Sequence, residues 1–509
     1  MLNRREHLLG LAMALLAAPG GLSAAAPGRR AAPAGRPFSW DWLKGEALRV
    51  AQAPWREPRA FHGAHAIDFD AVGQIGYRPD KTLWPDGGDA AVRFFPLNRY
   101  ANVPVDIFVV EGGMARPFPF STGLFSTAPS RHGVAPEIPP GFAGMRFMNP
   151  GGKGDWLAFQ GASYFRSAGA LDQYGLSARA LAVNTGIDGR EEFPIFTRFW
   201  LERGPGDAVT VHALLEGKSV TGAWRFVNRR GKAGVTQDVS LVLWLRADVE
   251  RLGFAPLTSM FWYGEGNRRQ AIDWRPEIHD SDGLELFTGA GERIWRPLGN
   301  PSRPIVNSFA DKGPRGFGLF QRDRDFDHYQ DDGAFYEKRP DLWVEPQGDW
   351  GTGAVMLYEI PTERETDDNI VAFWTPSAPA RAGNHYALDY RLNWIAADPE
   401  QGALARAVDC WTGIAGRPGT EPIPGARRLV ADFSGRKLVG LTRESDVAAV
   451  ISIGGGKLIE SHAYPVVGKP GLWRLIVDVA RSGVGPTDLR AYLRHDGDAL
   501  SETLLYQFD

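Results

Sequence analysis

The chain has 509 residues, more than one hydrophobic core usually organises, so at least two domains are expected. With 43% hydrophobic and 23% charged residues, its composition is that of a soluble globular protein. A net charge of -3, with no concentrated run of lysine and arginine, argues against the basic surface that neutralises phosphates, so no nucleic-acid partner is expected. The single cysteine, Cys410, excludes an intramolecular disulfide and a cysteine-rich metal site, and we predict that it is buried.

Residues 1–26 have the pattern of a cleavable signal peptide, which predicts export to the periplasm. A basic start at Arg4 and Arg5 precedes an apolar run at 8–18 and small residues at 23–26. The apolar run is shorter than the roughly 20 residues of a spanning helix, so we expect no membrane span after cleavage. The arginine pair suggests twin-arginine export. The Sec route stays open, because His7 stands where twin-arginine signals usually carry a large apolar residue.

The mature chain is expected to begin with a short disordered lead-in. Residues 27–36 are rich in proline, glycine and alanine, which is typical of such a segment. Aromatic and aliphatic residues then recur at helical spacing between Phe38 and Ala53, directly before Pro54. This spacing predicts one short helix.

From about residue 67, short runs rich in valine and aromatic residues alternate with glycine, proline, asparagine and aspartate. This pattern predicts strands. The clearest segments are 103–110, 208–214, 239–245, 316–321, 354–360, 370–374 and 386–395. Because few helical periodicities interrupt them, a large antiparallel β-sandwich over 37–396 is favoured over a parallel α/β fold.

A polar, small-residue stretch at 397–405 is predicted to be a linker between two domains. Beyond it, residues 406–509 hold further short strand segments, at 428–433, 448–453, 473–479, 489–494 and 504–508. Their length and spacing suit a small immunoglobulin-like β-sandwich that folds as its own domain.

The chain lacks the usual metalloprotease, hydrolase and nucleotide-binding motifs, and its ten histidines are dispersed, so neither a metal nor a cofactor is expected. Lone histidines such as His279 and His328 are interpreted as structural. Between residues 262 and 374, carboxylates are instead embedded among aromatic residues, a combination that suits a sugar groove. The candidate sugar-binding residues are Trp262, Arg322, Tyr329, Trp343 and Trp350. A tryptophan-rich core with charged loops would give a similar pattern.

Longer segments of the chain resemble a known family. They are FQGASYFR (159–166), YGLSARALAVNTG (174–186), EEFPIFTRFW (191–200), LTSMFWYGE (257–265), RPEIHDSDGL (275–284), RGFGLFQRDRDFDHYQD (315–331), LWVEPQGDWGTGAV (342–355) and DNIVAFWTP (368–376). In these segments the chain resembles the periplasmic glucan biosynthesis family, OpgG and OpgD (also MdoG and MdoD). The arginine pair of the signal makes it more similar to the OpgD branch.

The resemblance implies a galactose-mutarotase-like sandwich with a deep acidic cleft, followed by an immunoglobulin-like domain. It also implies a role in osmoregulated periplasmic glucans, whose backbone is β-1,2-linked glucose. Some members are regarded as inverting endo-β-1,2-glucanases, glycoside hydrolases in which one aspartate is the acid and another the base. By resemblance the acid here is Asp368, with Asp367 as the alternative, and the base is Asp280, with Asp282 as the alternative.

Physical chemistry is compatible with that pair. Inversion needs a protonated carboxyl and a carboxylate about 6.5–9.5 Å apart on opposite faces of the sugar. Asp368 precedes the apolar Ile370, Val371 and Phe373, so we expect it to be desolvated, which favours the protonated form. Asp280 lies in a polar loop, where it would stay ionised. Simpler interpretations are a turn at Asp368-Asn369 and a tight loop ending at Gly283.

Three functions remain open from sequence. The first is the glucanase. The second is a non-catalytic factor that binds the glucan emerging from a membrane glucosyltransferase, with the C-terminal domain as a docking module. The third is a transferase that adds branches. Aromatic stacking serves all three, whereas only the glucanase needs an acid and a base that face each other across a cleft.

Overall fold

The computed structural model describes residues 35–508, apart from 129–134, 207, 398–401, 418, 420 and 484. The expected signal peptide and most of the lead-in therefore lie outside the described residues. The last lead-in residue, Arg36, is not part of a disordered segment. It begins strand β1 (Arg36–Pro37), which pairs with β5 (Met114–Pro117). None of the helices among the described residues has the length and apolar character needed to cross a membrane.

The prediction of an all-β chain is confirmed, and every predicted strand segment overlaps an observed strand. The larger sheet has 16 strands among the described residues. Its order is β1, β5, β4 (Asp106–Glu111), β12 (Ile195–Arg203), β13 (Val209–Glu216), β14 (Val220–Gly231), β15 (Gly234–Leu245), β26 (His385–Ile395), β23 (Asp341–Gln347), β22 (Gly316–Phe320), β19 (Gly283–Phe287), β20 (Arg293–Pro297), β34 (Thr503–Phe508), β32 (Thr487–His495) and β29 (Ala448–Gly454), with β33 (Asp498–Ala499) beside β32.

A second sheet, with ten strands among the residues that the structure describes, lies in the same part of the chain. Its order is β21 (Ile305–Lys312), β24 (Thr352–Glu359), β25 (Ile370–Pro376), β16 (Leu252–Ser259), β10 (Ser177–Arg179), β9 (Tyr164–Ser167), β8 (Asp155–Gln160), β7 (Phe142–Met148) and β3 (Val92–Pro96), with β11 (Leu181–Val183) also on β16. Two small sheets pair β17 (Phe261–Tyr263) with β18 (Ile278–His279) and β2 (Ile75–Tyr77) with β6 (Phe125–Thr127). Nearly all strand pairs are antiparallel, and the exceptions include β4 with β12.

The two large sheets share one hydrophobic core. Phe226 of β14 packs edge-on against Phe159 of β8 and Phe165 of β9, with ring centroids 5.3 and 5.0 Å apart. Along β15, Val239, Leu241 and Leu243 are buried while the residues between them are half-buried. This alternation gives the strand one core face, which is the geometry of a sandwich.

The helix predicted near the N-terminus is α1 (Trp40–Gln52). The hydroxyl of Ser39 accepts a hydrogen bond from the N–H of Trp42 and caps the first turn. Leu43, Ala47 and Val50 form its buried face, which packs on the larger sheet. The other helices are α2 (Phe69–Val72), α3 (Phe326–Tyr329) and the 3-10 helices η2 (His62–Ala66), η3 (Pro79–Lys81), η4 (Gly88–Ala90), η5 (Thr122–Leu124), η6 (Glu265–Gln270), η7 (Tyr336–Lys338) and η8 (Arg436–Leu438).

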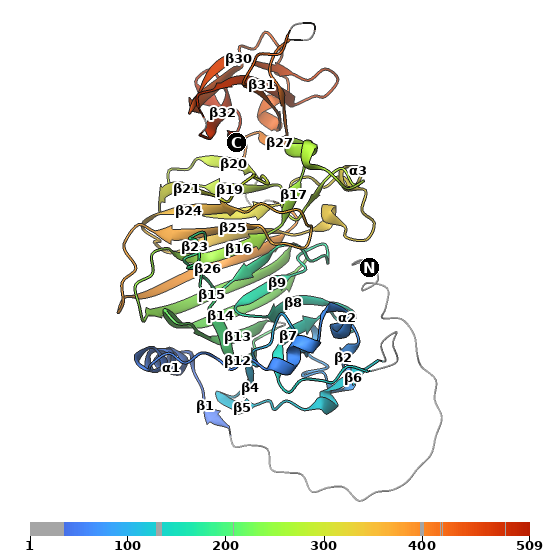
Figure 1. Ribbon diagram of the computed structural model, residues 1–509, viewed down its shortest axis with the longest axis vertical. Helices are drawn as coiled ribbons and strands as arrows, with labels where there is room; N and C mark the ends of the chain where they lie inside the picture. The colour runs from blue at the N-terminus through green and yellow to red at the C-terminus, as the bar shows by residue number, and fades with distance from the viewer. Residues whose placement is uncertain are drawn as a thin grey trace, which may run out of the picture.

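Strands after residue 405 form the end of the elongated molecule opposite the N-terminal strands (Figure 1). Four of them make a separate sheet in the order β27 (Arg406–Ile414), β28 (Ala426–Ser434), β31 (Leu472–Arg481) and β30 (Gly456–Pro465). The others extend the larger sheet, because β34 pairs in parallel with β20. Their core includes Trp295, Trp343 and Ile395 from before the expected linker, and Cys410 is buried in it. Independent folding of 406–509 stays a prediction.

Candidate active site

The segments that carry Asp280 and Asp368 meet at the turn between β16 and β17. The N–H of Asp280 donates to the carbonyl of Met260 at 2.7 Å. The side chain of Asn369 accepts from the N–H of Phe261 at 2.8 Å and donates to its carbonyl at 2.9 Å. Two loops that are far apart in the sequence are therefore anchored to adjacent residues, which places the two predicted catalytic segments in one region.

Asp280 is buried and its charge is compensated. Its Oδ1 lies 2.8 Å from Nη1 of Arg339, whose guanidinium stacks over the ring of Tyr336 at 4.4 Å. The Tyr336 hydroxyl donates to Glu365 at 3.1 Å, which ties this group to the loop before Asp368. Among the described residues, no protein group bonds to Oδ2 of Asp280. That oxygen can accept a proton from a water molecule.

Asp368 is exposed, so the desolvation expected from its apolar neighbours is not present. The chain enters the core only at Asn369 and Ile370, which are buried, while Asp367 and Asp368 remain at the surface. Asp368 acts electrostatically on Tyr164: burial is the main cause that raises the pKa of the Tyr164 hydroxyl, and the charge of Asp368 adds to it.

Asp367 faces a different space from the one near Tyr164. It lines a cavity of about 750 Å³ together with Trp262. Its carboxylate accepts a hydrogen bond from the hydroxyl of Thr362 at 3.3 Å. Trp262 is half-buried, and it is the one predicted sugar platform that the structure places beside a candidate acid.

Asp282, the alternative base, is half-buried and bonded to the protein. Its Oδ2 accepts the N–H of Asp323 at 2.7 Å, and its Oδ1 lies 3.5 Å from Nδ1 of His279. Burial raises the pKa of Asp282 to about 6, against the opposing effect of His279. The carboxyl of Asp282 is therefore engaged by the protein on both oxygens.

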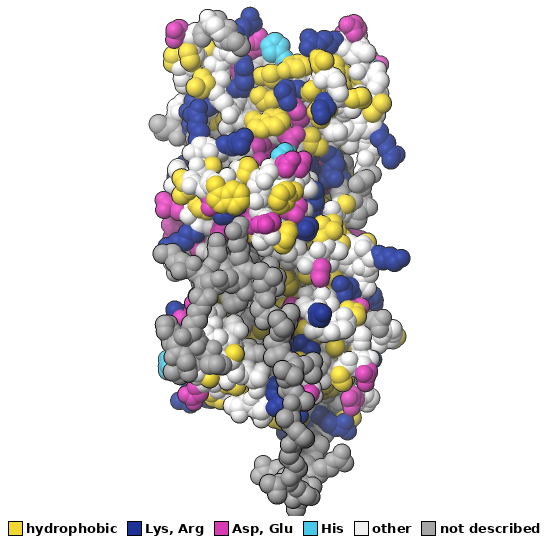
Figure 2. Space-filling model, turned by 90° about the vertical axis from the view of Figure 1, so that its right-hand side faces the viewer, with side chains coloured by type: hydrophobic (Ala, Val, Ile, Leu, Met, Phe, Trp, Pro, Cys, Tyr) yellow, Lys and Arg dark blue, Asp and Glu magenta, His cyan; other side chains and the backbone are white. Residues whose placement is uncertain are grey.

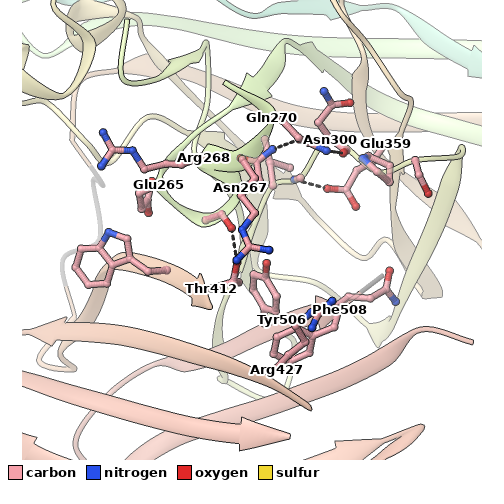
Figure 3. A pocket seen from close by; sticks show the side chains of 18 of the residues that line it. Glu265, Asn267, Arg268, Gln270, Asn300, Glu359, Thr412, Arg427, Tyr506 and Phe508 are labelled. Carbon is pink, nitrogen blue, oxygen red and sulfur yellow. Dashed lines mark hydrogen bonds between the residues drawn. The ribbon is translucent and has the colours of Figure 1, made fainter. Parts of the chain in front are cut away.

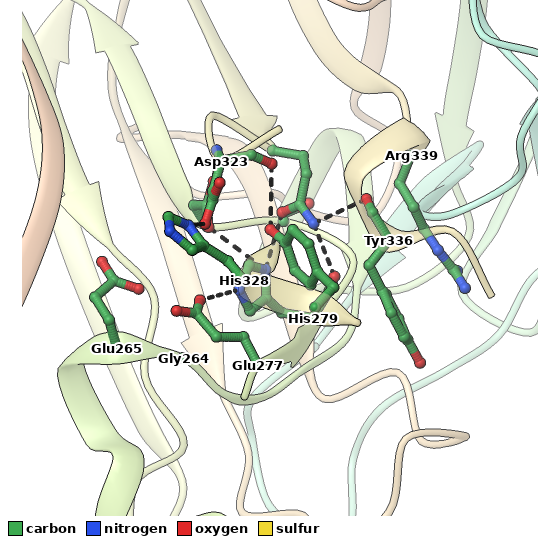
Figure 4. A network of polar contacts seen from close by, with 12 residues as sticks. Gly264, Glu265, Glu277, His279, Asp323, His328, Tyr336 and Arg339 are labelled. Carbon is green, nitrogen blue, oxygen red and sulfur yellow. Dashed lines mark hydrogen bonds and ion pairs between the residues drawn. The ribbon is translucent and has the colours of Figure 1, made fainter. Parts of the chain in front are cut away.

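His279 is the centre of a buried polar network (Figure 4). Its Nε2 lies 3.1 Å from Glu277 and its Nδ1 lies 2.9 Å from Oε1 of Gln321. Burial lowers the pKa of His279, but Asp282 and Glu277 outweigh it, with a smaller contribution from Glu265, and raise it to about 10. The structural interpretation of this histidine agrees with these contacts.

Arg322 is held inside the protein rather than in a sugar groove. Its guanidinium lies 3.5 Å from the centroid of the Trp295 ring and pairs with Glu285 at 2.9 Å and with Glu502 at 2.5 Å. It also donates to the carbonyl of Ala407 at 3.0 Å. Its donors are directed at the junction with the C-terminal strands, which corrects the expectation that they bind sugar hydroxyls.

Three further predicted platforms are core residues. Tyr329 is fully buried against His279, and Trp343 packs on Phe320 within the core that includes the C-terminal strands. Trp350 packs against Trp374 with ring centroids 6.3 Å apart. Because protein atoms cover these rings, they present no free face on which a sugar can stack.

Several exposed aromatic side chains are not among the predicted sugar platforms. Trp274 is 66% exposed and Tyr100 is 74% exposed. Phe193 and Tyr100 line a cavity of about 180 Å³ together with Tyr164, the tyrosine on which Asp368 acts electrostatically. Figure 2 shows hydrophobic and acidic side chains gathered together on one face of the molecule. Position in a polar loop, rather than in an alternating strand, was the signal that separated Trp274 from Trp343.

The fold and the site define a β-sandwich protein with a surface of exposed aromatics and carboxylates. The family described as "Periplasmic glucan biosynthesis protein, MdoG" matches residues 38–508. The chain is 44% identical over 519 residues to "Probable glucans biosynthesis protein D" of Shewanella oneidensis, covering 99% of this chain and 95% of that protein.

Two further relatives show the same extent of similarity. The "Glucans biosynthesis protein D 2" of Ralstonia nicotianae is 44% identical over 495 residues, which covers 93% of this chain and 91% of that protein. The "Glucans biosynthesis protein D" of Xanthomonas oryzae pv. oryzae is 42% identical over 527 residues, with coverage of 100% and 98%. The chain therefore belongs to the periplasmic glucan biosynthesis family.

Proposed function

We propose that this protein acts in periplasmic glucan biosynthesis by hydrolysing the β-1,2-linked glucan backbone with inversion. Asp368 is the general acid and Asp280 is the general base. The observation that carries the proposal is the common anchoring of the two aspartate loops on Met260 and Phe261. Family membership and the names of the relatives support the glucan as substrate and the periplasm as location.

The base role of Asp280 follows from its surroundings. An inverting base must stay ionised and must keep an oxygen available for the attacking water. The ion pair with Arg339 compensates its charge through Oδ1, and Oδ2 has no protein partner among the described residues. In Asp282, by contrast, both oxygens lie against protein groups.

The acid role of Asp368 requires the substrate to complete the site. The carboxyl is exposed in the free protein. A glucan chain over the loop would exclude water from it and favour its protonated form, which a general acid needs at neutral pH. Tyr100 and Phe193, which line a cavity with Tyr164, and Trp262 beside Asp367 give such a chain faces on which to lie.

The test compares the rate at which the wild-type protein and Asp368→Asn release reducing ends from linear β-1,2-glucan. Asparagine keeps the shape of the side chain but cannot donate the proton, so the rate should fall about 10²- to 10⁴-fold while glucan binding is kept. Asp367→Asn is the matched control, since it removes a neighbouring exposed carboxylate, and it should keep most of the rate. The opposite pattern in the two variants would move the acid to Asp367.

The exposure of Asp368 in the free protein favours a second candidate, a non-catalytic glucan-binding factor that works with a membrane glucosyltransferase. A binding surface needs the exposed aromatics but no desolvated acid. If the wild-type protein binds linear β-1,2-glucan but releases no reducing ends, this second candidate replaces the first.

A further inference from the structure

A large cleft lies where the 3-10 helix η6 meets the C-terminal strands (Figure 3). Its volume is about 630 Å³, within the range of ligand-binding sites. η6 is fixed to β27 by two hydrogen bonds: Glu265 accepts the N–H of Cys410 at 3.0 Å, and the carbonyl of Gly266 accepts the Thr412 hydroxyl at 2.7 Å. The cleft is therefore built from both parts of the molecule.

The cleft joins the cavity that holds Asp367 and Trp262. Both are lined by Gln270, Asn300, Pro301 and Ser302. A chain of hydrogen bonds stiffens this shared rim: Gln270 donates to the carbonyl of Asn300 at 3.0 Å, and Asn300 donates to the carbonyl of Thr362 at 2.7 Å. Because the two cavities share these residues, a polymer bound beside Asp367 can extend over the rim into the cleft.

The walls of the cleft offer sugar-binding chemistry. Trp411 and Tyr506 are half-buried aromatic residues that line it. Arg474 lies over the Trp411 ring at 5.4 Å and the ring of Phe508 packs edge-on to Tyr506 at 4.9 Å, so neighbours support both side chains. Aromatic faces held in this way suit the C–H faces of a sugar ring.

Arginine side chains complete the lining. Within the part of the chain that the structure describes, Arg268, Arg269 and Arg427 form no ion pair with a carboxylate. Figure 3 shows Arg427 with Tyr506 and Phe508 on the side of the cleft opposite Gln270 and Asn300. Guanidinium groups without a carboxylate partner keep donors for sugar hydroxyl groups.

We propose that this cleft is an accessory glucan-binding subsite, which holds the part of a long glucan chain that extends beyond the cavity of Asp367 and Trp262. The inference rests on the proposed function for its ligand, a neutral oligosaccharide. The C-terminal strands thereby extend the binding groove, because Trp411 and Tyr506 come from them. Short oligosaccharides that fill only the region of Asp367 and Trp262 gain nothing from the cleft.

The experiment is calorimetric binding of linear β-1,2-glucans of increasing length to the Asp368→Asn protein, in which hydrolysis is suppressed. Adding Trp411→Ala should weaken binding of the long chains about two- to tenfold, as expected for one aromatic face. Binding of the shortest oligosaccharides should not change. Arg427→Gln, at an exposed position, should show the same dependence on chain length. It replaces Trp411→Ala in the experiment if that variant does not fold.

The matched control is Tyr464→Ala. Tyr464 is also half-buried on the C-terminal sheet with an arginine, Arg443, over its ring at 5.2 Å, but it lies outside both cavities. The inference would be overturned if the cleft variants bound glucans of every length as tightly as Asp368→Asn alone. It would also be overturned if Tyr464→Ala lost as much affinity for long chains as the cleft variants do. Neither result would contradict the proposed hydrolysis. A length-dependent loss without hydrolysis by the wild type would support the cleft and reject the glucanase. If no length of glucan binds, both proposals fall.

Discussion

The Asp280 loop and the Asp368 loop share their anchor but differ in environment. Asp280 is buried and neutralised by Arg339 at 2.8 Å, whereas Asp368 is exposed in front of the buried Asn369. In the proposed mechanism, the protein thus completes the site of the base by itself, while the substrate closes the site of the acid. Preorganisation at one carboxylate and substrate-dependent desolvation at the other suit the different protonation states that inversion requires.

The largest effect is expected when the carboxylate of Asp280 is removed. Asp280→Asn should lower the rate of reducing-end release from β-1,2-glucan about 10²- to 10⁴-fold, because a water molecule without a base is a poor nucleophile. Asp282→Asn should keep more of the rate, since both oxygens of Asp282 already bond to the protein. A larger loss in Asp282→Asn would move the base to that residue.

The ion pair between Asp280 and Arg339 can be tested through stability. Arg339→Met leaves Asp280 buried without its partner, which should cost about 3–5 kcal/mol in the free energy of unfolding. The control is Lys338→Met, because the adjacent Lys338 pairs at 3.6 Å with Glu337 and is about half exposed. Its cost should be about 0–1 kcal/mol by urea denaturation. Equal costs in the two variants would show that Asp280 is not neutralised by Arg339.

The network around His279 should make the stability of the protein depend on pH. The pKa of His279 is raised to about 10 in the folded protein, above its ordinary value of about 6.5 in an unfolded chain. Its contribution to stability is therefore complete below about pH 6.5 and is lost as the pH rises toward 10. His279→Gln should flatten the fall in stability over this range in urea denaturation. Parallel curves for the two proteins would reject a charged His279.

The smallest expected effect concerns the exposed aromatics. Trp274→Ala should weaken glucan binding about two- to tenfold, because one stacking face is lost. Trp42→Ala removes another exposed tryptophan, 44% exposed on α1, and should leave the affinity unchanged. Unchanged affinity in Trp274→Ala, measured by calorimetry, would exclude this residue from the groove.

Local patterns in the sequence were enough for the strands but not for their partners. Segments such as 239–245 and 386–395 alternate or run apolar over a strand's length, so their strands β15 and β26 were predictable. The parallel pairing of β34 with β20 was not, since it joins Ile294 to Thr503 across the chain. No short-range pattern encodes such a contact. The expected linker also predicted two separate domains, so no pairing across it was expected.

In the candidate site, too, some features were predictable from the sequence and others depend on tertiary contacts. Resemblance to a family picked out Asp280 and Asp368, and the structure brings their loops together. Residue type alone did not separate Trp343, which lies in the core, from Trp274, which is exposed. Arg322 was misjudged because its partner Glu502 lies far along the chain, so its burial depends on tertiary contacts.

The central claim is tested most directly by the configuration of the first product. Proton NMR of linear β-1,2-glucan, recorded during early hydrolysis by the wild-type protein, distinguishes α- from β-anomeric reducing ends. With Asp280 as the base, α-anomers should appear first, since water attacks the face opposite the leaving group. Initial release of β-anomers would contradict the acid and base roles given to Asp368 and Asp280, and the absence of any new reducing end would contradict catalysis itself.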